Sequence, residues 1–101
     1  MTDRTIQLRR YMIAEGEMDA FLAWFRSTLL PARDRWGFTL EFAYAIRDSA
    51  EFVWATSLPG DAAAFRAIEA EYMASPERAA AFAGQPQRVL SMQLDFVEPL
   101  A

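Results

Sequence analysis

Twice in this sequence a strand pattern runs directly into a helix pattern, and this repeat constrains the fold more than any other feature. Residues Thr5–Ile13 alternate between two faces, and Glu15-Gly16 then breaks the run before an amphipathic helix. Residues Phe52–Leu58 form a second strand pattern, and Pro59-Gly60-Asp61 leads it into a second helix. The chain therefore contains two β-α units.

The helix patterns carry recognisable start and stop signals. The apolar stripe of the first helix consists of Met18, Phe21, Leu22, Phe25 and Leu29. Pro31 should kink or restart this helix, Arg33 and Arg35 suit the dipole at its end, and Gly37 should stop it. In the second half, Asp61 is a predicted N-cap, and Ser75-Pro76-Glu77 predicts a further helix start.

Two more strands complete the order of elements. Residues Phe38–Ile46 and Arg88–Val97 alternate, and the short polar segment Arg47–Ala50 fits a hairpin loop. The order β-α-β-β-α-β predicts one α+β domain over residues 1–101, with the ferredoxin-like fold. Its four-stranded antiparallel sheet would carry helices on one face only.

The uncovered face of that sheet leads us to expect a homodimer. Hydrophobic residues make up 53% of the chain and aromatic residues 14%, which is rich for 101 residues. Two sheets packed face to face, as in a dimeric α/β barrel, would bury this excess.

Charge and hydropathy exclude several partners. The net charge of -4 argues against nucleic acid, whose binders present basic surfaces to phosphates. No apolar run is long enough to span a bilayer, and the polar start of the chain does not resemble a signal peptide. We therefore expect a cytoplasmic protein. Abundant Ala and Arg without Lys or Asn suggests a GC-rich bacterial genome.

Missing residue types narrow the chemistry further. The chain has no cysteine, no histidine and no lysine, since all ten basic residues are arginine. Disulfides, thiol chemistry and Schiff bases are excluded, and zinc or haem ligation is not expected. We expect no metal and no cofactor.

Several short runs together resemble the NIPSNAP-like proteins. The runs are Leu8–Tyr11 with Gly16 following, Phe52–Trp54 with Leu58-Pro59, Tyr72–Glu77, and Phe96–Leu100. The resemblance covers nearly the whole chain and implies membership of the dimeric α/β-barrel superfamily. That superfamily also includes cofactor-free antibiotic-biosynthesis monooxygenases, stress-responsive barrel proteins and haem-degrading monooxygenases.

The resemblance also implies where a ligand would bind. In the wider superfamily, ligands commonly lie between the helices and the helix-facing side of the sheet. The pocket-facing polar residue of the haem-degrading members lies seven positions before the glycine, which is Arg9 here, and Tyr11 follows on the same face. This chain departs from those enzymes in having no histidine, and NIPSNAP-like proteins have no single established chemistry.

Arg9, Tyr11 and Glu41 are the candidate catalytic residues. Arg9 would anchor a carboxylate or phenolate oxygen, Tyr11 would donate a hydrogen bond, and Glu41 could accept a proton. The structural alternative pairs Arg9 with Glu41 or Asp95 and leaves Tyr11 as a core residue.

The facing of Glu41 depends on the hairpin register. A four-residue loop places Glu41 opposite Thr56, on the Trp54 face, whereas a five-residue loop places Tyr44 opposite Trp54. A slip of one residue turns every side chain to the other face, so both registers stay open.

Aromatic side chains are the candidates for ligand binding. Trp54, Tyr72, Tyr44 and Trp24 could line a pocket for a flat ligand, together with Trp36, Phe25 and Phe82; the alternative is an ordinary aromatic core. Trp54 and Tyr72 are preferred, because the superfamily pocket lies where the third strand meets the second helix. Glu69 and Glu71 are most simply explained as a solvated face.

Two functions of different classes remain. The first is a small-molecule-binding protein for an aromatic or anionic ligand, which as an enzyme would be a cofactor-independent oxygenase, cyclase or isomerase of an aromatic or polyketide-like substrate. The second is a non-catalytic homodimeric binding or interaction module, which predicts a space between helices and sheet filled by side chains.

Overall fold

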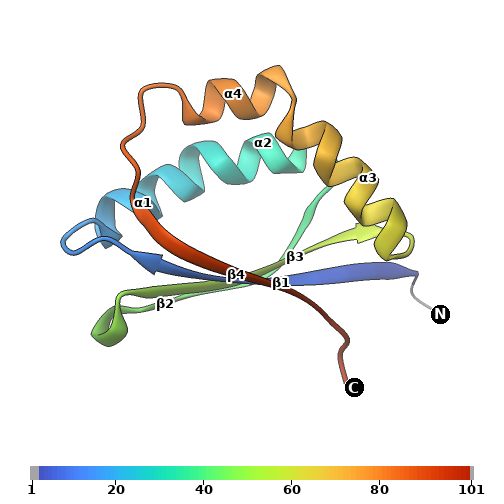
Figure 1. Cartoon of the computed structure of the whole chain (residues 1–101), viewed down its shortest axis with the longest axis horizontal. Helices are drawn as coiled ribbons and strands as arrows, with labels where there is room; N and C mark the ends of the chain where they lie inside the picture. The colour runs from blue at the N-terminus through green and yellow to red at the C-terminus, as the bar shows by residue number, and fades with distance from the viewer. Residues whose placement is uncertain (1–2, 101) are drawn as a thin grey trace.

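One antiparallel sheet organises the chain, with all helices on one of its faces (Figure 1). The computed structural model describes residues 3–100; Met1, Thr2 and Ala101, which belong to the predicted domain 1–101, lie outside the described part. The strands are β1 (Arg4–Ile13), β2 (Thr39–Ile46), β3 (Glu51–Pro59) and β4 (Val89–Val97), in the order β2-β3-β1-β4. This order confirms the ferredoxin-like α+β fold that the sequence predicted.

The first crossover is a single bent helical path around Pro31. It runs through α1 (Met18–Trp24), the π-helical turn η1 (Phe25–Leu29) and α2 (Leu30–Asp34). The backbone N–H of Leu30 reaches the carbonyl of Phe25, five residues back, one position before the proline that has no N–H to donate. The irregularity expected at Pro31 is therefore a π-turn that precedes it.

The second crossover consists of two capped helices, α3 (Ala62–Met73) and α4 (Pro76–Phe82). The Asp61 carboxylate accepts a hydrogen bond from the Ala64 N–H at 2.9 Å, and the Ser75 hydroxyl accepts one from the Arg78 N–H at 3.1 Å. Both predicted N-caps are confirmed. Each satisfies a backbone donor at a helix start and is worth about 1 kcal/mol.

The β2–β3 hairpin has the four-residue loop register, interrupted by a bulge. Ile46 pairs with Glu51, and Ala43 pairs with Trp54. The loop contains the short 3₁₀ turn η2 (Arg47–Ser49), and Ala50 follows in the left-handed conformation. Farther from the loop, Leu40 and not Glu41 lies opposite Thr56, so the extra residue at the bulge is Glu41.

The helix-facing side of the sheet is buried by two apolar clusters. One lies under α1 and η1 and consists of Tyr11, Ile13, Phe21, Phe25, Leu29, Phe52 and Trp54. The other lies under α2, α3 and α4 and consists of Ala32, Phe38, Leu58, Phe65, Tyr72 and Ala81. Fully burying one such side chain contributes about 1.5–3 kcal/mol.

The opposite face of the sheet, which we call the outer face, carries no helix. Phe42, Tyr44 and Ile46 of β2 are 37%, 66% and 40% exposed, and Met12 of β1 is 39% exposed. Large apolar side chains on one sheet face are uncommon on a monomer surface unless something binds there.

Candidate functional site

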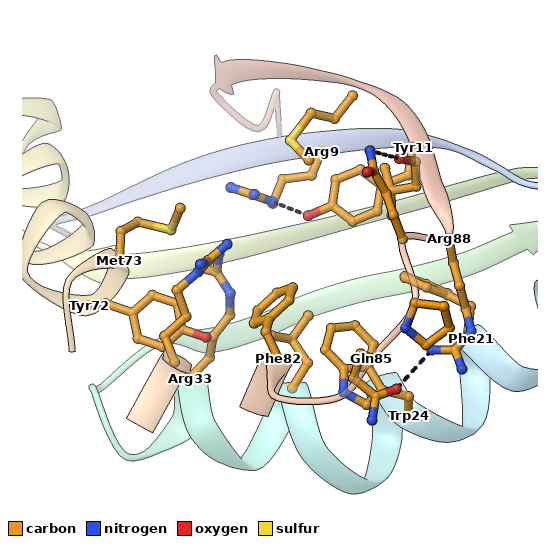
Figure 2. A pocket seen from close by; sticks show the side chains of 16 residues that line it. Arg9, Tyr11, Phe21, Trp24, Arg33, Tyr72, Met73, Phe82, Gln85 and Arg88 are labelled. Atoms are coloured by element: carbon orange, nitrogen blue, oxygen red, sulfur yellow. Dashed lines mark hydrogen bonds between the residues drawn. The ribbon is translucent and has the colours of Figure 1, made fainter. Parts of the chain in front are cut away.

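A cavity of about 410 Å³ lies between the helices and the sheet (Figure 2). Its walls come from β1, the helices of both crossovers, the segment after α4, and the start of β4. The lining residues are Arg9, Tyr11, Phe21, Trp24, Leu29, Arg33, Tyr72, Met73, Arg78, Phe82, Gln85, Pro86, Gln87, Arg88, Val89 and Met92. A volume of this size is typical of a small-molecule site.

Arg9 lies in the floor of the cavity, held by three neighbours. Its Nε donates to the Tyr11 hydroxyl at 2.8 Å, and its Nη1 donates to the Gln7 side-chain oxygen at 2.6 Å. Nη1 also lies 3.2 Å from a carboxylate oxygen of Glu69 on α3. Because Tyr11 accepts from Arg9, the proton of its own hydroxyl remains available for donation to a ligand.

Arg33, on α2, is a second buried cation at this cavity, and its guanidinium makes no hydrogen bond within residues 3–100. Its guanidinium lies 4.8 Å from the centre of the Tyr72 ring and 5.2 Å from that of Trp54. The nearest carboxylate oxygen, on Glu69, is 3.7 Å from Nη1, which is too long for a hydrogen bond. Nε and Nη1 are buried without a hydrogen-bond partner among residues 3–100.

Burial and the neighbouring Arg9 charge lower the pKa of Arg33 from its ordinary value, and nearby tyrosines and Glu69 oppose that shift. Arginine keeps its proton at all ordinary pH values, so the group stays charged. Two buried cations thus share one carboxylate, and a buried charge without a full partner is costly. This excess of positive charge is the main electrostatic property of the site.

Tyr72 brings an unused hydroxyl to the same end of the cavity. The side chain is fully buried, and its Oη has no hydrogen-bond partner among the described residues. Burial raises the pKa of Tyr72, and the positive charges of Arg33, Arg78 and Arg9 act against that rise. Tyr72 is therefore a neutral hydrogen-bond donor next to the buried arginines.

Aromatic side chains form the other end of the cavity. Trp24 lies 5.9 Å from Phe21 and 5.0 Å from Phe82, measured between ring centres, and its indole N–H donates to the Ala81 carbonyl. In Figure 2, Arg33 and Tyr72 lie on one side of Phe82, and Trp24 and Phe21 lie on the other. The cavity is thus cationic at one end and aromatic at the other.

Polar residues after α4 form the mouth. Arg88 donates to Glu17 at 3.1 Å and to Gln85 at 3.0 Å, so its charge has a partner. The Arg78 guanidinium lies over the Phe82 ring at 4.2 Å and is half-buried. The contact with Glu17 ties the end of the segment Ala83–Arg88 to the residue before α1.

The structure brings most of the predicted site residues together. Arg9, Tyr11, Trp24 and Tyr72 line the cavity. Trp54 does not line this cavity: it is fully buried, and its ring centre lies 5.2 Å from the Arg33 guanidinium. Its indole nitrogen has no hydrogen-bond partner among residues 3–100, and Trp54 and Arg33 both line a second hollow of about 380 Å³.

Glu41 and Tyr44 lie away from the cavity. The bulge carries Glu41 to the outer face, where its carboxylate accepts from Ser57 at 2.6 Å and from Arg4 at 3.1 Å. Tyr44 pairs with Val53 and also faces outward. Glu41 is therefore no part of this cavity, and the carboxylate that pairs with Arg9 is Glu69, which the sequence had assigned to a solvated face.

Sequence reasoning missed Arg33, Arg78, Arg88 and Glu69. A signal for Arg33 was present, because it continues the spacing of four from Phe25 and Leu29 along the buried stripe of the first helix. Arg33 lies near a helix end, where a favourable interaction with the helix dipole already accounted for it.

Within residues 3–100, no three acidic side chains gather as metal ligands would, and no helix is long and apolar enough to cross a membrane.

Comparison with known proteins shows the fold. No family model matches the chain, and neither does any curated protein. Among solved structures, an uncharacterized NIPSNAP domain protein from Burkholderia xenovorans has a TM-score of 0.81 at 17% identity, over 96% of this chain and 95% of that one. A NIPSNAP family protein from Agrobacterium tumefaciens has a TM-score of 0.84 at 12% identity, over 98% and 88%.

A putative antibiotic biosynthesis monooxygenase from Nitrosomonas europaea is more distant, with a TM-score of 0.70 at 10% identity over 99% and 93% of the two chains. Identities this low establish the architecture and leave the activity open. The ferredoxin-like fold of NIPSNAP-domain proteins, which the short sequence runs suggested, is confirmed.

Proposed function

We propose that this ferredoxin-like protein binds a small organic anion with a flat apolar body in the cavity between its helices and its sheet. The observation that carries the proposal is the pair of buried arginines, Arg9 and Arg33, which share the single carboxylate of Glu69. An anionic ligand group would complete the charge balance and accept from the unpartnered Arg33 and Tyr72 donors. Trp24, Phe21 and Phe82 would hold its apolar part.

The cavity favours this function over a purely structural interaction module. Such a module would fill the space between helices and sheet with side chains, whereas about 410 Å³ is open here. Unpartnered buried donors also favour a ligand, because native proteins leave few such groups without a partner.

If the protein turns its ligand over, the donors suit a reaction in which negative charge develops on oxygen. Arg33, Tyr72 and Tyr11 can stabilise an enolate or phenolate. Within residues 3–100, the acidic side chain that contacts the buried arginines is Glu69, and both of its arginine contacts, with Arg9 and Arg33, are on one carboxylate oxygen. Cofactor-independent cyclisation, isomerisation or oxygenation of an acidic aromatic or polyketide-like substrate fits these groups, since such a substrate supplies its own anion.

A homodimer formed through the outer face completes the proposal. Exposed Phe42, Tyr44 and Ile46 provide an apolar surface on that face, and Arg10 makes no ion pair within residues 3–100. A second copy would cover them by two-fold pairing of the same surface. Light scattering at micromolar concentration should give twice the chain mass of 11.5 kDa, and Tyr44→Glu should halve it. A monomeric wild-type protein would contradict this part.

Calorimetric titration with 2-naphthoate and its neutral analogue 2-naphthalenemethanol tests the binding proposal. The two probes share a ring system that suits the aromatic end and differ in charge. We expect the carboxylate to bind at least about tenfold more tightly, because one charge-assisted hydrogen bond supplies about that much. Equal affinities, or no binding of either probe at millimolar concentration, would overturn the proposed function.

A further inference from the structure

We propose that Glu69 sets the charge of the ligand, so that the cavity selects carboxylates, phenolates and enolates over dianions such as phosphate monoesters. This inference rests on the proposed function and sharpens it to a substrate class. It depends on how many charges the cavity already contains and where they lie.

The cationic end of the cavity, where Arg9, Arg33 and Tyr72 lie, is called the deep end. Its buried ion-pairing side chains have a net charge of one positive. Arg9 and Arg33 contribute two cations, with side chains 7% and 5% exposed, and Glu69 contributes one anion at 19% exposure. The Tyr11 hydroxyl accepts from Arg9, and the Tyr72 ring lies 4.8 Å from the Arg33 guanidinium. A ligand with one negative charge brings this group to neutrality, and a dianion leaves an excess negative charge beside the Glu69 carboxylate.

Two further cations, Arg78 and Arg88, line the cavity and are less buried than Arg9 and Arg33. Arg88 already has Glu17 as its partner, 3.1 Å away. The charge of Arg78 also acts on Tyr72, but Arg78 is half-buried over the Phe82 ring, so water screens its charge more than it screens the buried Arg9 and Arg33. The deep end therefore determines which ligand charge is preferred.

One carboxylate has enough acceptor positions for the unused donors of Arg33 and Tyr72. Arg33 Nε, Arg33 Nη1 and Tyr72 Oη are buried without acceptors among the described residues. A carboxylate has two oxygens with about four acceptor positions between them, and a phenolate or enolate oxygen has fewer. A phosphate monoester adds a third oxygen and a second charge without a further deep cation to receive it.

Helix α3 provides both the residue to change and its control. Glu69 faces the arginines, and Glu71, two residues along the same helix, is exposed and makes no ion pair within residues 3–100. Glu69→Gln and Glu71→Gln remove the same charge from the protein. Only the first change raises the charge of the deep end from one positive to two.

The test is calorimetric titration of 2-naphthoate and 2-naphthyl phosphate at pH 8, where the phosphate is a dianion because its second pKa is about 6. We expect the wild type and Glu71→Gln to prefer 2-naphthoate by at least about tenfold, because the second negative charge of the phosphate is repelled by the Glu69 carboxylate. Glu69→Gln should cancel or reverse this preference.

The outcomes separate the two proposals. If the wild type binds 2-naphthoate but Glu69→Gln shifts the preference no more than Glu71→Gln does, the charge selection is wrong and the anion site stands. If the wild type binds neither probe, both proposals fail.

If Glu69→Gln does not fold, Arg33→Met tests the same count of buried charges. This variant leaves Arg9 and Glu69 as a neutral pair, and both anions should then bind no better than 2-naphthalenemethanol. Retained anion preference in Arg33→Met would overturn the inference.

Discussion

Two arginine–carboxylate networks lie on opposite faces of one sheet, and they differ in charge balance. On the outer face, Glu41 accepts from Arg4 and Ser57, so one cation meets one anion in contact with water. On the helix-facing side, Glu69 serves both Arg9 and Arg33, and the arginine donors that remain are buried. The first network is complete, whereas the helix-facing network lacks an acceptor.

This difference explains why the outer network has a structural character and the helix-facing network has the properties of a binding site. A partly exposed pair such as Arg4–Glu41 contributes about 0–1 kcal/mol. Buried unpaired donors destabilise the ligand-free protein, and such a cost persists where a function needs the groups. Substitutions made in matching pairs, one in each network, test the contrast.

Removing the shared carboxylate should have the largest effect. Glu69→Gln leaves two buried arginines uncompensated and should lower the free energy of unfolding by about 3 kcal/mol. Glu41→Gln removes a partly exposed partner and should cost less than about 1 kcal/mol. Urea denaturation measures both, and equal losses would show that the two networks do not differ as described.

Removing the Tyr72 hydroxyl should have an intermediate effect. The change should raise the stability of the protein and weaken ligand binding. Tyr72→Phe removes a buried hydroxyl without a partner and should raise the free energy of unfolding by about 1 kcal/mol. It should also weaken 2-naphthoate binding by about fivefold, since one donor is lost. Tyr44→Phe on the outer face should leave both unchanged, and a destabilised Tyr72→Phe would indicate a hydrogen bond that the structure lacks.

The pH dependence of stability gives a related prediction for Tyr72. Burial raises its folded-state pKa above the usual value of 10.0, although nearby Arg33 opposes the rise. The unfolded chain then ionises first, so stability is fully present below pH 10.0 and is lost as the pH rises through the folded pKa. Denaturation between pH 9 and 11.5 should show a smaller decline in Tyr72→Phe; identical declines would contradict the assignment.

Cations at the mouth should have the smallest effect. Arg88 is already paired with Glu17, so Arg88→Gln should weaken 2-naphthoate binding by only about threefold, a difference that added salt removes. Arg47 pairs with Asp19 at an exposed position, and Arg47→Gln should leave 2-naphthoate binding unchanged. If Arg88→Gln lowered the affinity for 2-naphthoate tenfold or more, the anion would bind at the mouth and not at Arg33.

Local signals in the sequence were sufficient for the fold. Alternation, the N-caps at Asp61 and Ser75, and the short loop before β3 each depend on neighbouring residues, so the elements followed directly. Pro31 showed where the first helix would be irregular. That it produces a π-turn depends on how α1 and α2 pack on the sheet, which the sequence does not state.

Part of the site was predictable, namely Arg9 and Tyr11 on one strand and the aromatic residues Trp24 and Tyr72 on two helices. Arg9 and Tyr11 share a face of β1, and alternation alone places them there. The facing of Glu41, which the sequence left open, is determined by one bulge between Leu40 and Phe42 that sequence alternation does not reveal. Glu69 and Arg33 come from different crossovers, and only the tertiary fold brings them together.

The most direct test of the cation excess compares Arg33→Met with Arg4→Met, with and without 2-naphthoate. Without the ligand, Arg33→Met should exceed the wild type in stability by about 1 kcal/mol, because a neutral Arg9–Glu69 pair remains and a buried unpaired charge is gone. With the ligand at saturation the order should reverse, since Arg33→Met should bind about 30-fold more weakly. Arg4→Met should follow the wild type in both conditions. If Arg33→Met were less stable without the ligand and bound it as tightly as the wild type, the account of a charge excess that holds an anion would be contradicted.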